Sequence, residues 1–266
     1  MVNLALAAAL AAATPATPPP SPVADNPAMF MVRDSDTTVY IFGTFHALDG
    51  KSQWFDHDVK DAFEKSDELV LETLVPEGPS QRVSFGPGFR PPPVTPSASF
   101  LATTRMAISA GRAQGMQVDN GADMVLRHQA EAEGKPVEGL ETLQFQIEMF
   151  NHMPSSGAAP PATRSEAAAE PNQMESLSKA MSDMQSAWKR GDQSVFVSML
   201  RQLKAASPDT YRMMFTERNA RWADWIKARM QTPGTVFVAV GAGHLAGPDS
   251  LLVRLAEHGV SSRRVY

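Results

Sequence analysis

Cysteine is missing from this chain of 266 residues. Its absence excludes disulfide bonds, thiolate metal sites and a cysteine nucleophile, and it leaves the cellular compartment open. Dense positive charge is missing as well, since the formal net charge is −5 and the isoelectric point is about 5.7. Without a basic cluster interleaved with aromatic residues, the sequence predicts no nucleic-acid partner. With 43% hydrophobic and 20% charged residues, the chain fits one globular domain with a substantial core and insertions.

The first 27 residues lack the pattern of a core element. Residues 1–13 form an alanine- and leucine-rich run that resembles the apolar part of a secretory signal, without the preceding basic residues, which leaves room for a start upstream. The run is too short to span a bilayer, and six prolines between positions 15 and 27 predict an extended linker. We therefore expect an exported, periplasmic or extracellular protein, with membrane association only through an uncleaved leader, and a single domain over residues 28–266. The alternative is an alanine-rich leader without a targeting role.

Two apolar runs far apart in the sequence lead into the same Gly-x-x-His pattern. The first, Val-Tyr-Ile-Phe-Gly-Thr-Phe-His, ends at His46, and the second, Val-Phe-Val-Ala-Val-Gly-Ala-Gly-His, ends at His244. Runs that are apolar on both faces are typical of strands covered by helices on both sides. Because ligands bind at the carboxyl ends of such strands, we expect the two imidazoles to face one crevice. For each histidine alone, an ordinary capping or core role is the alternative.

The remaining strand and helix signals predict a mixed α/β fold, with a central mixed β-sheet flanked by helices. We expect strands over residues 29–33, 37–42, 68–72, 116–119, 137–140, 234–240 and 260–266. A helical insertion over residues 172–230 separates the two Gly-x-x-His halves, and its last helix is expected over 209–230. Residues 75–97 are rich in proline and glycine and are interpreted as a loop, either a mobile flap over the site or a plain surface insertion.

Acidic and basic residues stand where apolar neighbours predominate. Glu72 closes an apolar strand, and Glu141 follows another. Arg218 and Asn219 fall within the aromatic stripe of the helix expected over 209–230, where each unsatisfied polar group costs about 1–3 kcal/mol. We therefore expect both to point into a polar pocket that holds carboxylates or a bound anion. The alternative is a buried structural ion pair between Arg218 and Glu72 or Glu141.

Together these blocks resemble the TraB/GumN family, which is related to the Tiki proteins and more distantly to erythromycin-esterase-like and ChaN-like proteins. The resemblance covers residues 29–266. It rests on Tyr-Ile-Phe-Gly-Thr-Phe-His to position 46, Leu-Val-Leu-Glu to position 72, Gly-Lys-Pro-Val-Glu-Gly-Leu-Glu-Thr to position 142, Gln146, the Arg218–Asn219 pair, and Val-Gly-Ala-Gly-His-Leu-Ala-Gly to position 247. The chain departs from the family between positions 72 and 119, where helices are expected and a proline-rich segment stands instead.

The resemblance implies a metal-dependent hydrolase, peptidase- or esterase-like, that acts on a peptide or small-molecule substrate. A divalent ion, whether Mn, Co, Fe or Zn, would be bound by His46, Glu72 and His244, and it would lower the pKa of a bound water. Glu141 would then be the general base. Arg218 and Asn219 would stabilise the oxyanion that forms during the reaction.

Three other interpretations stay open at this point. In a metal-free variant, a histidine acts as the base and a glutamate orients it. A binding protein would hold haem, a metal or another ligand in the same crevice without turning it over. A degenerate family member would serve only to bind a partner. The sequence gives no indication of the oligomeric state.

Overall fold

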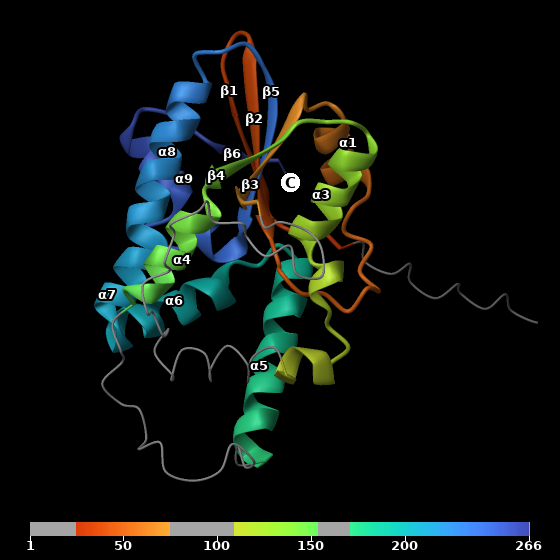
Figure 1. Ribbon diagram of the computed structural model, residues 1–266, viewed down its shortest axis with the longest axis vertical. Coiled ribbons are helices and arrows are strands. Elements are labelled where there is room, and N and C mark those ends of the chain that lie inside the picture. The colour runs from red at the N-terminus through yellow and green to blue at the C-terminus, as the bar shows by residue number, and fades with distance from the viewer. Residues whose placement is uncertain (1–24, 75–108, 154–170, 266) are drawn as a thin grey trace, which may run out of the picture.

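The computed structural model describes residues 25–74, 109–153 and 171–265 (Figure 1). The signal-like leader, the proline-rich loop at 75–97 and the low-complexity stretch after residue 153 lie largely or wholly outside these residues. In the part of the chain that is described, no helix is long and apolar enough to cross a membrane.

Six strands form one mixed sheet in the order β4-β3-β5-β2-β1-β6. The strands are β1 (Met29–Arg33), β2 (Thr37–Thr44), β3 (Glu68–Thr73), β4 (Val137–Glu141), β5 (Gly234–Gly241) and β6 (Arg263–Arg264). The four strands β4, β3, β5 and β2 are parallel, while β1 runs antiparallel to both β2 and β6. The expected mixed α/β class with a central mixed sheet is therefore confirmed.

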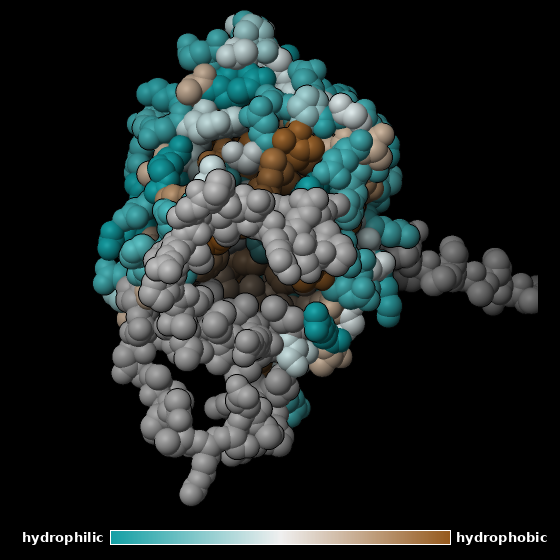
Figure 2. Space-filling model, viewed as in Figure 1, coloured by the Kyte–Doolittle hydropathy of each residue, from teal (hydrophilic) through white to brown (hydrophobic). Residues whose placement is uncertain are grey.

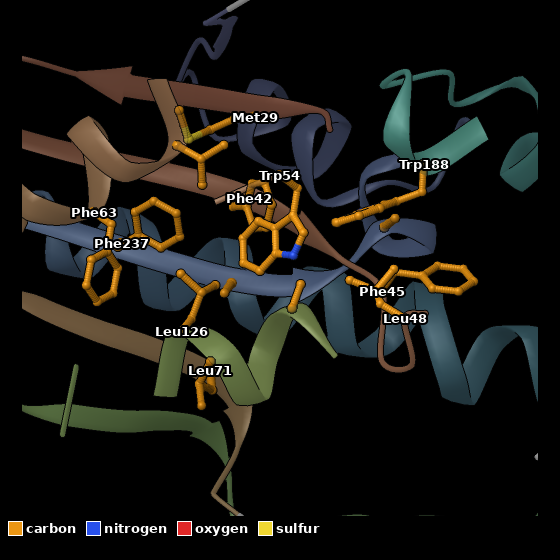
Figure 3. Close-up of a cluster of buried hydrophobic side chains, with 14 of the residues drawn as sticks. Met29, Phe42, Phe45, Leu48, Trp54, Phe63, Leu71, Leu126, Trp188 and Phe237 are labelled. Carbon is orange, nitrogen blue, oxygen red and sulfur yellow. The ribbon is translucent and has the colours of Figure 1, made fainter. Parts of the chain in front are cut away.

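The side chains of the central strands alternate between two hydrophobic clusters, one on each face of the sheet. On one face, Phe42 and Phe237 pack with residues of α1 (His57–Glu64), α3 (Ala122–Ala132) and α5 (Pro171–Lys189) (Figure 3). On the other face, Ile41 and Val238 pack against α8 (Glu217–Arg229) and α9 (Leu251–Glu257). Burial on both faces explains why these strands read as continuous apolar runs.

The remaining helical segments lie around the end of the sheet where the parallel strands finish. They are η1 (Val118–Asn120), α4 (Leu143–Asn151), α6 (Ser194–Ala206), α7 (Pro208–Tyr211), the π-helical turn η2 (Arg212–Thr216) and the 3₁₀ turn η3 (Ala242–Leu245). The indole nitrogen of Trp188 in α5 donates a hydrogen bond to the carbonyl oxygen of Gly43, at 2.7 Å. This buried bond fixes α5 against the end of β2, next to the first Gly-x-x-His.

Three element predictions differ from the structure. The expected strand at 116–119 is a single bridge between Gln117 and Leu48, followed by η1. The strand expected over 260–266 is limited to β6, Arg263–Arg264, among the residues that the structure describes. The helix expected over 209–230 is divided into α7, η2 and α8, because five residues adopt π-helical hydrogen bonding that a regular 3.6-residue pattern does not reveal.

Candidate active site

The two Gly-x-x-His motifs meet around Gly241, the last residue of β5. A Cβ atom placed on Gly241 would lie 3.1 Å from Oε1 of Glu72, 3.4 Å from Nε2 of His46 and 3.8 Å from Cδ2 of His244. The three side chains come from the ends of β3, β2 and β5, which are neighbours in the sheet. Glycine leaves room for them to approach one another, and its N–H donates to Oε1 of Glu72 at 2.6 Å. The expectation that both imidazoles reach one crevice is thus met.

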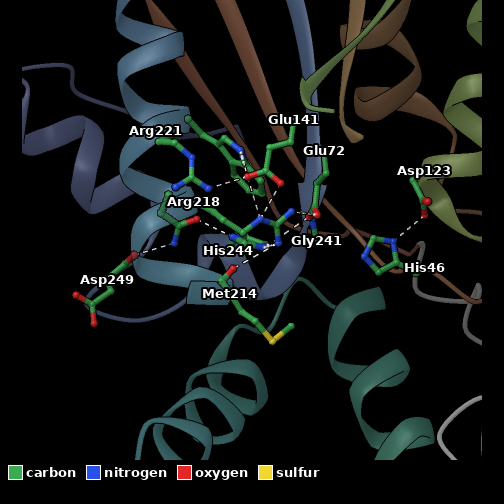
Figure 4. A network of polar contacts seen from close by, with 12 residues as sticks. His46, Glu72, Asp123, Glu141, Met214, Arg218, Arg221, Gly241, His244 and Asp249 are labelled. Atoms are coloured by element: carbon green, nitrogen blue, oxygen red, sulfur yellow. Dashed lines mark hydrogen bonds and ion pairs between the residues drawn. The ribbon is translucent and has the colours of Figure 1, made fainter. Parts of the chain in front are cut away.

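Arg218 of α8 is the centre of the polar network behind this point (Figure 4). Its Nε donates to both oxygens of Glu141, at 3.0 and 3.1 Å, and its Nη2 donates to Oε2 of Glu72 at 2.8 Å. Its Nη1 lies 3.2 Å from Nε2 of His244. The arginine is only 4% exposed, so removal of its partners would leave a buried charge unpaired. Both expected partners, Glu72 and Glu141, therefore bind the same guanidinium.

The π-helical turn η2 lies just before Arg218 and provides it with a backbone acceptor. In a π turn the backbone bonds skip one residue, which leaves a carbonyl without its usual helical partner. The carbonyl oxygen of Met214 accepts a hydrogen bond from Nη1 of Arg218 at 3.4 Å. The turn thus supplies an additional acceptor for the guanidinium, and π turns of this kind occur often at functional sites.

His244 is buried and held as a neutral imidazole. Its Nδ1 donates to Oδ1 of Asn219 at 2.7 Å, because Arg218 can only donate and so requires Nε2 to accept. The ring packs against Trp222 and Phe215, with centroid distances of 4.4 and 4.8 Å. Burial lowers the pKa of His244 to about 3, although the negative charge of Glu72 opposes this shift. The positive charges of Arg218 and His46 add to the lowering. His244 therefore stays uncharged at neutral pH.

His46 lies in the opposite environment. Its side chain is 62% exposed, and its Nδ1 lies 3.2 Å from Oδ1 of Asp123, near the start of α3. Partial desolvation of the ring by the surrounding protein would by itself lower the pKa of His46. The hydrogen bond and charge of Asp123, with the charge of Glu72, outweigh this and raise that pKa to about 9. The pair leaves Nε2 of His46 directed toward the space in front of Gly241.

The side chains of Glu72 and Glu141 both accept hydrogen bonds from nearby N–H groups. Burial alone would raise the pKa of Glu72, but the positive charges and the Gly241 N–H around it lower that pKa to about 2. Glu141 accepts hydrogen bonds from Arg218, from Arg221 at 3.2 Å and from the indole of Trp222 at 3.2 Å. Because its oxygens are directed into these ion pairs, Glu141 is placed to hold Arg218 and not to take a proton from a water.

A hollow of about 1140 Å³ opens beside this network. The space-filling view shows this face hollowed near its centre, with hydrophobic surface visible within (Figure 2). Four of the six predicted site residues line the hollow: His46, Glu72, Arg218 and His244. Glu141 and Asn219 are not among its described lining residues. Both ends of the Asn219 amide are engaged, since its Nδ2 donates to the carbonyl oxygen of Asp249 at 2.8 Å and its Oδ1 accepts from His244, so Asn219 orients His244.

The donors expected to bind a metal do not form a three-ligand site as they are arranged. The acceptor nitrogen of His244 and one oxygen of Glu72 are both occupied by the guanidinium of Arg218, and the other oxygen of Glu72 accepts from Gly241. A shared ion would have to displace that cation. Over residues 25–74, 109–153 and 171–265, no group of three or more histidine and acidic side chains has the geometry of a metal site. Metal binding by His46, Glu72 and His244 stays a prediction.

Sequence reasoning missed Asp123, which stands at the start of a helix without a motif around it. Its position depends on Gly121, where a Cβ atom would lie only 2.3 Å from the carbonyl oxygen of His46. The N–H of Ala122 donates to the carbonyl oxygen of Phe45 at 3.0 Å. The start of α3 is therefore fixed against the loop that carries His46. A glycine two residues before an aspartate was the one available signal, and it is weak by itself.

Comparison with known proteins agrees with the arrangement of these motifs. The model of the TraB/PrgY/gumN family matches residues 28–84 and 92–264. Searches of curated proteins and of solved structures give no match. The family match spans most of the sequence and includes all six predicted site residues. The chain therefore belongs to the TraB/PrgY/gumN family.

Proposed function

We propose that this protein is a hydrolase in which His46, oriented by Asp123, is the general base. The observation that carries the proposal is the His46–Asp123 pair at the rim of the hollow, with an Nε2 that faces open space beside a buried charged network. A histidine with one nitrogen held by a carboxylate and the other free is the usual arrangement for proton transfer. The metal-free interpretation expected a glutamate to orient the base, whereas the nearby orienting carboxylate belongs to Asp123.

In this mechanism Nδ1–H of His46 donates to Asp123, and the unprotonated Nε2 takes a proton from a water molecule. That water attacks the carbonyl carbon of the substrate, and His46 then gives the proton to the leaving group. Base catalysis of this kind contributes typically about 10²–10⁴-fold in rate. Because the pKa of His46 is raised, the unprotonated form becomes more abundant as the pH rises into the alkaline range.

Two hydroxyl groups near the strand ends are candidates to orient the substrate carbonyl. Thr44 and Thr73 line the hollow, and their Oγ1 atoms are buried without a hydrogen-bond partner among the residues that the structure describes. An unmet buried hydroxyl costs about 1–3 kcal/mol, a cost that a hydrogen bond to a substrate or to an ordered water would offset. Arg218 supports the same end of the hollow by its positive charge, although its nitrogens are engaged by protein acceptors.

The test is a hydrolysis screen with esters and peptides, run with a chelator and with Mn, Co, Fe or Zn added. We expect turnover in the presence of the chelator, and its loss in His46→Asn. His57→Asn is the matched control, because His57 is an exposed histidine outside the hollow whose φ of 34° asparagine tolerates. Unchanged turnover in His46→Asn would rule out the proposal. An absolute requirement for added metal would overturn the metal-free base and restore the metal-dependent scheme.

A second function is favoured by the size of the hollow, which is larger than hydrolysis of a small ester requires. A protein that holds haem, a metal or another ligand would bind it through the same exposed imidazole of His46. Titration with haem distinguishes the two functions. A saturable shift of the haem absorption band that is lost in His46→Asn, without hydrolysis of any substrate, supports binding in place of catalysis.

A further inference from the structure

The lining of the hollow includes charged side chains and an uncharged wall. The charged residues of the lining are His46, Glu72, Arg112, Asp119, Asp123, Arg127 and Arg218. The uncharged wall is formed by unbranched and aromatic side chains from three helical segments, α5, α6 and η2: Met181, Met184, Phe196, Met199, Met214 and Phe215. Five of these six are only partly buried, and Phe196 is buried at 4% exposure, so most of the wall presents hydrocarbon and sulfur to the hollow.

The wall begins directly at the polar network. The ring of Phe215 lies 4.8 Å from that of His244, and a Cβ atom on Gly243 would come within 3.2 Å of Phe215. Met214 places its carbonyl oxygen on Arg218 while its side chain lines the hollow (Figure 4). A ligand whose reacting group lies at His46 can therefore extend along the wall.

The chemistry of the wall discriminates between possible occupants. Thioether sulfur is a weak acceptor and a phenyl ring has no conventional donor, so the wall cannot replace hydrogen bonds that a ligand loses from water. A peptide backbone laid along it would have unsatisfied amide groups, whereas a hydrocarbon chain loses none. Methionine side chains have three rotatable bonds, which lets them adapt to chains of different length and curvature.

We propose that the hollow binds the acyl chain of a fatty-acyl ester, with the ester carbonyl at His46 and the chain along the α5–α6–η2 wall. This inference rests on the proposed hydrolase function. The reaction adds water across the acyl C–O bond: the water oxygen bonds to the carbonyl carbon, the bond to the alcohol oxygen breaks, and the proton released to His46 passes to the departing alkoxide. The products are a fatty acid and an alcohol, and no other reactant is required.

The first experiment compares kcat/KM for p-nitrophenyl acetate, butyrate, octanoate and decanoate, each corrected for its spontaneous hydrolysis. The shared leaving group keeps the chemical step constant. Since each buried CH₂ group adds up to about fourfold to binding, we expect kcat/KM to rise at least about tenfold from acetate to octanoate. Equal values across the series, or a preference for acetate, would overturn the inference while leaving the hydrolase function intact.

A matched pair of variants locates the acyl chain. Met214 lines the hollow, whereas its neighbour Met213 is not among the described lining residues. Met214→Gln should lower the octanoate-to-acetate ratio of kcat/KM at least about threefold, because a polar amide replaces hydrocarbon contact. Met213→Gln should leave that ratio as it is in the unsubstituted protein. If both variants change the ratio equally, the chain does not lie along this wall.

Binding without turnover separates this inference from the proposed function. Displacement of a fluorescent fatty-acid probe by decanoate is measured on His46→Asn and on the unsubstituted protein. Displacement by decanoate but not by acetate, reduced in Met214→Gln, supports the acyl site even if no ester is hydrolysed, in which case only the hydrolase function fails. Absence of probe binding to the folded protein at neutral pH overturns the acyl site.

Discussion

The two Gly-x-x-His motifs are nearly the same in sequence and differ in almost every physical respect. His46 is largely exposed to the hollow and paired with a carboxylate, so its pKa is raised. His244 is buried between aromatic rings, bonded to an amide and an arginine, and its pKa is lowered. Two like groups whose surroundings move their pKa values apart are suited to separate tasks. We assign proton transfer to His46 and the positioning of Arg218 to His244.

The two histidines differ because the chain takes a different path after each strand. After β2 the chain leaves the sheet and meets the start of α3, so His46 stays at the rim beside Asp123. After β5 the chain turns at once into η3 beneath α8, so His244 is covered by Trp222 and Phe215. The motif places each imidazole at the end of a strand, and the helix packed beside the imidazole determines whether the ring is charged.

The largest effect is expected from removing the cation that holds the buried region together. Arg218→Leu leaves Glu72 without its main partner, and it leaves Glu141 with only the contacts of Arg221 and the indole of Trp222. Breaking a buried ion pair in this way costs about 3–5 kcal/mol. Urea unfolding measures the loss. Arg221→Leu is the control, since Arg221 is 45% exposed and its contacts are one ion pair with Glu141 and a cation–π contact with Phe145, so it should cost less than about 1 kcal/mol. Similar losses in the two variants would contradict the central place of Arg218.

The same comparison is sharpened by truncating each histidine. His244→Ala removes a buried ring and one hydrogen bond from each of Asn219 and Arg218, so we expect a loss of about 2–4 kcal/mol in unfolding free energy. His46→Ala removes an exposed ring and should change stability by less than about 1 kcal/mol while abolishing turnover. Thermal and urea unfolding of the two variants, measured together, provide the test. A loss of stability at His46 as large as that at His244 would show that both histidines are structural.

The pH dependence of activity tests the pairing of His46 with Asp123. The base must be unprotonated, so kcat/KM should rise with pH through the raised pKa of His46 and reach its plateau on the alkaline side. Asp123→Asn removes the negative charge that stabilises the imidazolium, which lowers that pKa and moves the rise to lower pH. The plateau value should fall at the same time, because the ring is less well oriented. A profile that keeps its midpoint in Asp123→Asn would remove Asp123 from the mechanism.

The smallest effect concerns a hydroxyl group in the first motif. Thr44→Val keeps the shape of the side chain and removes a buried hydroxyl without a partner among the described residues. Because no hydrogen bond is lost in the folded protein, unfolding free energy should be unchanged or slightly higher. Turnover should fall if the hydroxyl donates to the substrate, and kcat should fall more than KM changes. A drop in stability with unchanged kcat would indicate a structural role instead.

Most of the sheet could be predicted because its central strands are buried on both faces. Their apolar runs are long enough to be identified from the sequence alone, and β1, β2, β3, β4 and β5 lie within a few residues of their expected positions. The short segment after residue 115 is predicted as a strand because it is brief and alternates apolar and polar residues, and those properties do not distinguish a strand from a single bridge followed by a 3₁₀ turn.

The site was predictable in its members and less so in their contacts. Four members could be predicted because each follows an apolar strand or interrupts the apolar face of a helix, and both patterns can be recognised in the sequence. They are His46, Glu72, Arg218 and His244, and all four line the hollow. The sequence did not reveal that Arg218 binds both Glu72 and Glu141 at once, nor the π-helical turn before it, whose Met214 carbonyl is a further acceptor. Asp123 depends on a helix start that docks against a distant loop, and such long-range contacts are not encoded in any local pattern.

The most direct test of the account is an NMR titration of the histidine side chains, with assignments from His46→Asn and from His244→Gln if that variant folds. We predict that the ring of His46 titrates well above 6.5, and that the ring of His244 keeps its proton on Nδ1 and stays neutral into the acidic range. If both rings titrate together near 6.5, or if His244 is the one that is protonated at neutral pH, the division of roles between the two motifs is wrong.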